Sequence, residues 1–303
     1  ASDVYKRQLH FQSSSVPVML HQVPRYLSRI NEDKRTKVAL LVVDGMSAGQ
    51  WLVIRDEIKK QKKAIKLKED LVYAWVPTIT SVSRQALFAG KPPYYFSSSI
   101  HTTDKEEKLW KQFWTEQGFS QSEIIYIKGL GDMSDLSYVD EAITHPKVKI
   151  AGLIIDKVDQ IMHSMVLGMP GTQTMIRQWA KTNFLSDLIV KLESNGFKIF
   201  ITSDHGNTES IGFGLPSEGS VADLRGERVR IYPDELLRKR VKEKYPDSIE
   251  WPSIGLPSNY CALIANKRFA FTRENEKSIS HGGISIDEVL IPFIEIESEN
   301  KNG

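Results

Sequence analysis

The stretch Ile201-Thr-Ser-Asp-His-Gly-Asn207 decides how this chain of 303 residues is interpreted. It closes an apolar run that begins at Phe197 and is typical of a buried parallel strand. Asp204 and His205 therefore follow the end of a strand, which is where open α/β sheets bind their ligands. An adjacent carboxylate and imidazole at that edge indicate a divalent metal site, and a purely structural Asp–His pair is the alternative.

Apolar runs alternate with amphipathic segments on both sides of this stretch. The expected strands lie at 37–43, 72–76, 124–127, 148–155, 197–202, 260–265, 269–271 and 289–296. The expected helices lie at 49–63, 81–89, 104–117, 174–195 and 234–244. This alternation predicts an α/β fold with a mixed, mostly parallel sheet and helices on both faces. Residues from about 208 to 257 show no strong strand pattern and predict a small cap insertion.

The two ends of the chain differ from its centre. The chain starts with Ala, and residues 2–8 resemble adapter-derived sequence, so residues 1–36 are expected to be a non-native or linker segment at the start of a fragment. The main domain is expected at residues 37–296, and residues 297–303 are expected to form a polar tail.

Composition excludes several classes of protein. The chain is 41% hydrophobic and 26% charged, and its apolar runs are shorter than the roughly 20 residues that a membrane helix needs. A formal charge of +2 gives no general argument for nucleic acid. The single Cys261 excludes an internal disulfide framework and fits a reducing compartment. We therefore expect a cytoplasmic protein with no signal peptide and no membrane contact.

Further potential ligands follow other strands. Asp44 follows the first expected strand, and Asp159 and His163 lie after the fourth, four residues apart and thus on one side of a helical turn. His281 precedes two glycines, which suit a close backbone approach. Each also has an ordinary explanation: a helix cap for Asp44, a surface contact for the Asp–His pair and a tight turn at the glycines.

A nucleophile candidate lies in Pro77-Thr-Ile-Thr80-Ser-Val-Ser-Arg84, which follows a strand and begins a helix. A hydroxyl there meets the positive end of the helix dipole and free N–H groups that suit a phosphate oxygen, and an N-cap is the alternative. Threonine needs activation, which a metal ion can supply, since bound Zn²⁺ lowers the pKa of water from about 15.7 to about 7. Arg84, one turn later, is expected either to bind a phosphate oxygen or to lie on the surface.

Taken together and in this order, these segments resemble the alkaline phosphatase superfamily and, within it, the PglZ domain of BREX-type phage-defence systems. Leu41-Val-Val-Asp44-Gly-Met and the segment from Ser280 to Pro292 resemble PglZ in particular. Residues 77–93 resemble the nucleophile segment of nucleotide pyrophosphatase/phosphodiesterases, and residues 204–207 also resemble cofactor-independent phosphoglycerate mutases. The resemblance covers about residues 37–296.

The resemblance implies a binuclear metal centre with Thr80 as the nucleophile and its oxygen between the ions. One ion would be held by Asp159, His163 and His281, and the other by Asp44, Asp204 and His205. Asp156 is the rival of Asp159, because it follows the strand more directly. Two divalent ions are expected, Zn²⁺ before Mn²⁺.

Substrate contacts are expected from Arg84 and from Asn207, for which capping the turn is the alternative. Ser83 stands where the nucleotide pyrophosphatases have Asn, so the substrate orientation of that family does not transfer. A basic stretch between residues 225 and 244 would attract a polyanion if it overhung the metals, and a solvated cap helix is the alternative.

The leading prediction is a metal-dependent phosphoester hydrolase of phosphodiesterase or nuclease type that works with other proteins of a bacterial phage-defence system. Its substrate would be a phosphoester, including nucleotides or nucleic acid. A non-catalytic metal-binding scaffold is the first alternative. A phosphatase or phosphomutase of the same superfamily is the second, although the insertion is small for the clamping domain of a mutase.

Overall fold

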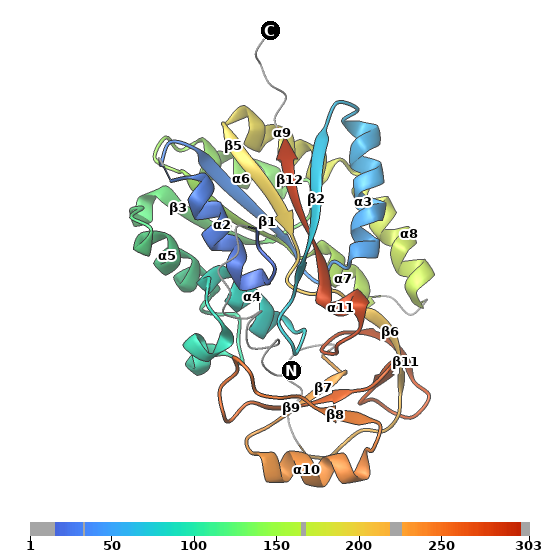
Figure 1. Ribbon diagram of the computed structural model, residues 1–303. Helices are drawn as coiled ribbons and strands as arrows, with labels where there is room; N and C mark the ends of the chain where they lie inside the picture. Colours follow the sequence, from blue (N-terminus) through green and yellow to red (C-terminus); the bar gives the residue numbers. More distant parts are fainter. Residues whose placement is uncertain (1–15, 33, 165–167, 219–225, 298–303) are drawn as a thin grey trace.

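The central sheet of the computed structural model has six strands, and the structure describes residues 16–32, 34–164, 168–218 and 226–297. The strand order is β2-β12-β5-β1-β4-β3. The bounds are β1 (Lys37–Val43), β2 (Lys66–Tyr73), β3 (Ile124–Leu130), β4 (Ile150–Ile155), β5 (Phe197–Thr202) and β12 (Leu290–Glu297). β1 pairs in parallel with β4 and β5, whereas β12 runs antiparallel to both of its neighbours. The predicted mixed, mostly parallel sheet is therefore confirmed (Figure 1).

Two hydrophobic cores, one on each face, hold this sheet. Alternate residues of β1 point to opposite faces: Leu41 packs into one core and Leu40 into the other. The first face is covered by α3 (Ala48–Gln61), α6 (Asp135–Thr144), α7 (Lys157–Ser164), α8 (Gly168–Ala180) and α9 (Phe184–Ser194). The second is covered by η1 (Leu20–Gln22), α2 (Val23–Ile30), α4 (Thr80–Ala89) and α5 (Glu106–Glu116). None of the described helices is long and apolar enough to cross a bilayer.

Two small sheets lie beyond the carboxyl ends of the parallel strands, in the lower half of Figure 1. The order β10-β6-β11 joins β6 (Thr208–Gly212), β10 (Phe269–Ala270) and β11 (Lys277–Ser280). The order β7-β9-β8 joins β7 (Val229–Tyr232), β8 (Ser248–Glu250) and β9 (Cys261–Ala265), and α10 (Glu235–Lys244) follows β7. The remaining short helices are η2 (Pro93–Ser99), η3 (Gln121–Glu123) and α11 (Ile286–Val289).

The insertion expected at about residues 208–257, which has no strong strand pattern, contains β6, β7, β8 and α10. Its strands are only three to five residues long, too short for a clear alternating pattern. The segments at 260–265 and 269–271 join these small sheets rather than the central one, so only β12 returns to the central sheet.

The sheet β7-β9-β8 is buried on both faces. Ile231 and Ile264 pack on one face against residues at the start of α4, such as Ile79. Tyr232 and Leu263 pack on the other face, in a cluster that includes Val241 of α10. This sheet therefore separates α10 from the nucleophile segment.

Three other expectations need correction. The helix expected at 174–195 is two helices, because Asn183 adopts a left-handed conformation (φ 69°) between α8 and α9. The expected linker at 1–36 contains α2, whose Leu27 is completely buried in the core. The strand expected at 72–76 begins at Lys66 and ends at Tyr73. It is an edge strand paired with β12, and its first residues are charged and mostly exposed, so they lack the apolar pattern of a buried strand.

Candidate metal centre

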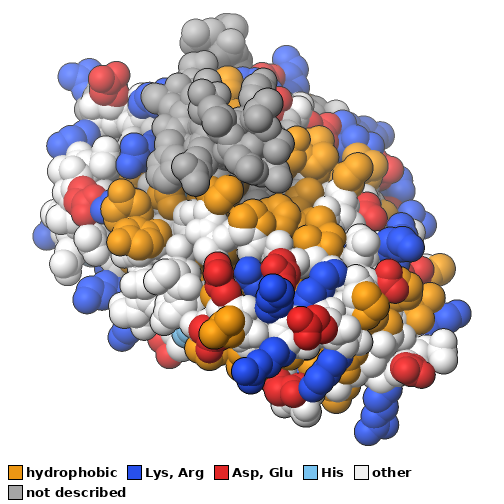
Figure 2. Space-filling view, turned by 60° about the horizontal axis from the view of Figure 1, so that its bottom comes forward, with side chains coloured by type: hydrophobic (Ala, Val, Ile, Leu, Met, Phe, Trp, Pro, Cys, Tyr) orange, Lys and Arg blue, Asp and Glu red, His pale blue; other side chains and the backbone are white. Residues whose placement is uncertain are grey.

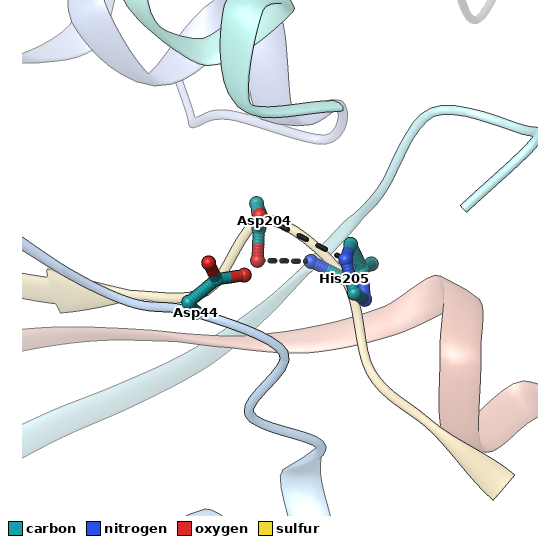
Figure 3. A group of neighbouring side chains, drawn as sticks. All are labelled: Asp44, Asp204 and His205. Carbon is teal, nitrogen blue, oxygen red and sulfur yellow. Dashed lines mark hydrogen bonds and ion pairs between the residues drawn. The ribbon is translucent and has the colours of Figure 1, made fainter. Parts of the chain in front are cut away.

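Three neighbouring parallel strands each end in an aspartate at the same edge of the sheet. Asp44 follows β1 in the centre, Asp156 follows β4 on one side, and Asp204 follows β5 on the other. Ligand atoms of Asp44, Asp204 and His205 all lie within 4.8 Å of one another, and all three residues are buried (Figure 3). The strand-end prediction thus brings together one of the two expected ligand sets.

The turn after β1 is packed tightly against this cluster. Gly45 has a positive φ of 66°, and a Cβ atom there would lie 2.6 Å from Met162 Cε. Its N–H donates to Asp204 Oδ1 at 3.0 Å, and the N–H of His205 donates to the same oxygen at 3.0 Å. One oxygen of Asp204 therefore fixes the turns after β1 and β5.

The remaining carboxylate oxygens fit a cation. Among the described residues, Asp204 Oδ2 and Asp44 Oδ1 are buried and have no hydrogen-bond partner. Burying such atoms without a partner is costly, so native proteins use them for ligands or ions. Carboxylate and imidazole ligands together suit Zn²⁺ or Mn²⁺.

The pKa shifts of the two carboxyls also favour a bound cation. Burial raises the pKa of Asp44 well above its ordinary value, against the lowering effect of Arg84, and Asp204 and Asp159 raise it further. Burial also raises the pKa of Asp204, again against Arg84. Both carboxyls therefore ionise with difficulty until positive charge is added nearby.

Both histidines at the site are held in one tautomer by backbone carbonyls. His205 Nδ1 lies 3.0 Å from Gly206 O, and His281 Nδ1 lies 3.0 Å from Thr78 O. A carbonyl only accepts, so both Nδ1 atoms carry the hydrogen and both Nε2 atoms are unprotonated in the neutral rings. The rings stack with their centroids 4.1 Å apart. Second-sphere carbonyls of this kind are typical of metal-ligating histidines.

Thr80 is the first residue of α4 and reaches the cluster directly. Its Oγ1 lies 3.0 Å from His205 Nε2 and, because that nitrogen is unprotonated, donates its hydrogen to it. Neither Thr80 nor Ile79, the N-cap residue of α4, provides a side-chain cap, so the alternative role of Thr80 as an N-cap is not used.

Arg84 is buried in the site rather than on the surface, so the surface alternative is wrong. Its Nη1 lies 2.5 Å from Asp44 Oδ2 and 3.9 Å from Asp204 Oδ2. Its Nε donates to Glu106 Oε1 at 2.9 Å. Burial acts to lower the pKa of Arg84, but Asp44 and Glu106 outweigh it and raise that pKa.

The second expected ligand set is only partly described. His281 stacks on His205, as above. Asp159 is half-buried on α7; a Cβ atom on Gly45 would lie 3.7 Å from its Oδ1 and 3.8 Å from His205 Cε1, so both side chains flank that turn. His163 lies in α7, but its side chain is outside the described part of the structure. Asp156 also faces a charged environment: burial raises its pKa, and Oδ1 has no hydrogen-bond partner among the described residues.

Asn207 has structural partners. Its Nδ2 donates to Gly45 O at 2.6 Å and to Gln50 Oε1 at 3.0 Å, and its Oδ1 accepts from Gln50 Nε2 at 3.2 Å. Contact with a substrate through these hydrogens would require those bonds to break. Ser83, in the place of the asparagine of the nucleotide pyrophosphatases, donates to Trp75 O and accepts from Trp75 N.

Two residues at the site, Thr78 and Glu106, were not among the residues predicted from the sequence. Thr78 Oγ1 donates to Gly283 O at 2.9 Å and accepts from Gly282 N at 3.1 Å, which ties the nucleophile segment to the loop of His281. The repeated threonine of Pro77-Thr-Ile-Thr80 was the available signal. Glu106 had none, because the pattern around it is that of a surface helix.

The basic helix α10 does not overhang the metals, because the sheet β7-β9-β8 lies between α10 and α4. The lower face of Figure 1, where α10 lies, is turned forward in Figure 2. Acidic and basic side chains are interspersed there rather than gathered in one basic patch. The solvated cap helix is the better description.

Structures of known proteins share this fold. Murine ectonucleotide pyrophosphatase/phosphodiesterase 5, an inactive threonine-to-alanine variant in complex with AMP, has a TM-score of 0.63 at 13% identity, covering 86% of this chain and 88% of that one. Phosphonoacetate hydrolase from Sinorhizobium meliloti 1021, in complex with phosphonoacetate, has a TM-score of 0.51 at 14% identity, covering 89% and 92%. These likenesses show an alkaline phosphatase-like fold. No curated protein sequence matches the chain.

The family itself is shown by sequence. The family model described as the BREX system PglZ alkaline phosphatase-like domain matches residues 25–296. That range includes most of α2, within the segment expected to be a linker, as well as both small sheets and all but the last residue of β12. The chain therefore belongs to the PglZ family of alkaline phosphatase-like domains.

Proposed function

We propose that this PglZ domain is a metal-dependent phosphoester hydrolase with Thr80 as its nucleophile. The observation that carries the proposal is the contact of Thr80 Oγ1 with His205 Nε2, beside two buried carboxylate oxygens that lack hydrogen-bond partners among the described residues. A threonine needs such a setting to attack phosphorus at neutral pH.

The excess of carboxylates at the site supports bound divalent ions. Arg84 lies among Asp44, Asp156, Asp159, Asp204 and Glu106, which affect one another's pKa values. When ionised, these five carboxylates outnumber the positive groups that face them, Arg84 and Lys128, so divalent cations would neutralise the remaining charge. Asp44, Asp204 and His205 would hold one ion, and Asp159, His163 and His281 the other. Zn²⁺ is the first choice and Mn²⁺ the second.

In the proposed reaction, Thr80 Oγ1 gives up its proton to solvent and attacks phosphorus in line with the leaving oxygen. The new P–O bond gives a phosphothreonine, while the bond to the leaving group breaks and the leaving oxygen takes a proton from solvent. Water then hydrolyses the phosphothreonine, which restores the Thr80 hydroxyl and releases the phosphoryl group. Divalent ions bound at the site would supply Lewis acidity to the attacking and leaving oxygens. Arg84 would neutralise a non-bridging oxygen, while the Thr78 contacts hold the nucleophile segment against the loop of His281.

The murine neighbour supports a nucleotide-like phosphoester as the substrate, because an inactive threonine-to-alanine variant of it is in complex with AMP. We also propose, from the BREX family description, a cytoplasmic role in phage defence together with other proteins of that system.

Replacing Thr80 tests the mechanism. Thr80→Ala should lower turnover of bis(p-nitrophenyl) phosphate by about 10³-fold or more, because the proposed mechanism uses the Thr80 hydroxyl as its nucleophile. Metal binding, measured by calorimetry, should persist. Thr80→Ser keeps a hydroxyl and serves as the control: it should retain measurable turnover and become phosphorylated at residue 80, which mass spectrometry detects. Undiminished turnover by Thr80→Ala refutes the mechanism, and a metal-replete wild type that hydrolyses no phosphoester favours the scaffold.

A further inference from the structure

A buried chain of polar contacts leads from the metal-ligand pair into the protein. Tyr126 Oη donates to Glu106 Oε2 at 2.6 Å, and Glu106 Oε1 accepts from Arg84 Nε at 2.9 Å. Arg84 Nη1 then reaches Asp44. Glu106 is completely buried and Arg84 is 5% exposed. Burial and the charge of Glu106 raise the pKa of Tyr126, so the phenol stays a neutral donor.

Glu106 has no evident structural need in this place. It lies in the first turn of α5, in a segment whose sequence is that of a surface helix, and a buried carboxylate costs free energy unless it is paired. Asp44 already gives Arg84 an anionic partner at 2.5 Å. A second carboxylate becomes useful when the first is engaged elsewhere. With Asp44 and Asp204 used as metal ligands, Glu106 is the anion left to hold Arg84 in the site.

We propose that Glu106, oriented by Tyr126, is a positioning residue that holds the Arg84 guanidinium beside the metal ligands, where it binds the phosphoryl anion of the substrate. The geometry of Arg84 allows this division: Nε faces Glu106 and Nη1 faces the aspartates, while Nη2 makes no hydrogen bond with the described residues. This inference rests on the proposed function and adds the residues that orient its substrate-binding arginine.

Inorganic phosphate is the probe, so the test needs no turnover. With Zn²⁺-loaded protein, titration calorimetry should show that Glu106→Gln weakens phosphate binding about tenfold, the scale of a charge-assisted hydrogen bond. Zn²⁺ affinity should change by less than about threefold. Tyr126→Phe keeps the Glu106 carboxylate but removes its hydrogen-bond donor, and it should weaken phosphate binding about threefold. This second variant keeps the proposal testable if Glu106→Gln does not fold.

A double variant separates positioning from general damage. If Glu106 acts through Arg84, Glu106→Gln should add no further loss of phosphate affinity in an Arg84→Ala background. Glu57→Gln, which alters another buried carboxylate on α3, is the matched control and should leave phosphate binding unchanged. Additive losses, unchanged phosphate binding by Glu106→Gln, or an equal fall in Zn²⁺ affinity each overturn the inference. If the wild type hydrolyses nothing, the proposed hydrolysis fails while this test stands.

Discussion

Two buried Arg–Glu pairs in this protein have the same geometry and different surroundings. Arg84 with Glu106 and Arg228 with Glu288 each have an Nε–Oε1 distance of 2.9 Å, and all four side chains are almost completely buried. The first pair lies beside the candidate metal centre. The second lies where the small sheets meet the segment leading into β12.

The side chains of the second pair are themselves saturated with hydrogen bonds. Arg228 also donates to Phe269 O at 2.6 Å and to Lys267 O at 2.8 Å. Glu288 accepts from the N–H groups of Gly283 and Ser285 and from the Ser285 hydroxyl. The first pair instead adjoins Asp44 and Asp204, each with an oxygen that lacks a hydrogen-bond partner among the described residues. A buried ion pair therefore indicates function only when groups around it remain unsatisfied.

The largest effect is expected at the saturated pair. Glu288→Ala should lower the free energy of unfolding by about 3–5 kcal/mol, because it leaves Arg228 buried without its counter-ion. Urea denaturation followed by circular dichroism measures this loss. Glu288→Gln keeps a hydrogen-bond acceptor and should lose less than the alanine variant. A loss below about 1 kcal/mol for Glu288→Ala would mean that the two pairs do not differ in this way.

At the metal centre we expect a smaller effect, in which a substitution raises the stability of the protein instead of lowering it. Asp204→Asn should stabilise the metal-free protein at pH 8, because it removes a buried carboxylate whose pKa is raised by burial. A carboxyl whose pKa is raised by folding destabilises the folded protein above that pKa, and this cost disappears as the pH falls. The advantage of the variant should therefore shrink as the pH is lowered and wild-type Asp204 becomes protonated.

Addition of Zn²⁺ should make the wild type more stable than Asp204→Asn. At 100 times its dissociation constant, Zn²⁺ should stabilise the wild type by about 2.7 kcal/mol and Asp204→Asn by much less. Thermal denaturation with and without EDTA measures both effects. Equal stabilisation of the two proteins by Zn²⁺ would contradict the assignment of Asp204 as a ligand.

The smallest effect is expected on α10. Reversing the charge of Lys239 and Arg240 together should change kcat/KM for a phosphodiester by less than about twofold at physiological salt, since the sheet β7-β9-β8 lies between this helix and α4. Steady-state kinetics at low and high salt provide the measurement. A salt-dependent fall of tenfold or more would restore the steering role that the sequence suggested.

Strand ends were the part of the site that the sequence predicted well. A continuous apolar run followed by Asp, as in Val43–Asp44, fixes both the strand and the edge where its aspartate lies. The same reasoning placed Asp204 and His205, and the family resemblance added Thr80. The positions of these residues could be predicted because local sequence and sheet topology both determine them, and their roles stay predictions.

Other features depend on tertiary contacts that leave no local pattern. Glu106 is buried because Arg84 and Tyr126 meet it, not because of helix periodicity. The strands of the small sheets are short and gain their order from packing against α4 and α10. The reciprocal amide pair of Asn207 and Gln50 joins residues 157 positions apart.

The central place of β1 has a consequence for synthesis on the ribosome. This strand emerges before both of its neighbours in the sheet, β4 and β5, which are more than 100 residues further along the chain. Until those strands leave the exit tunnel, the apolar segment from Val38 to Val43 lacks its pairing partners. Exposed segments of this kind are aggregation-prone and are the usual targets of chaperones. Host proteins that bind nascent apolar strands should therefore raise the yield of this domain.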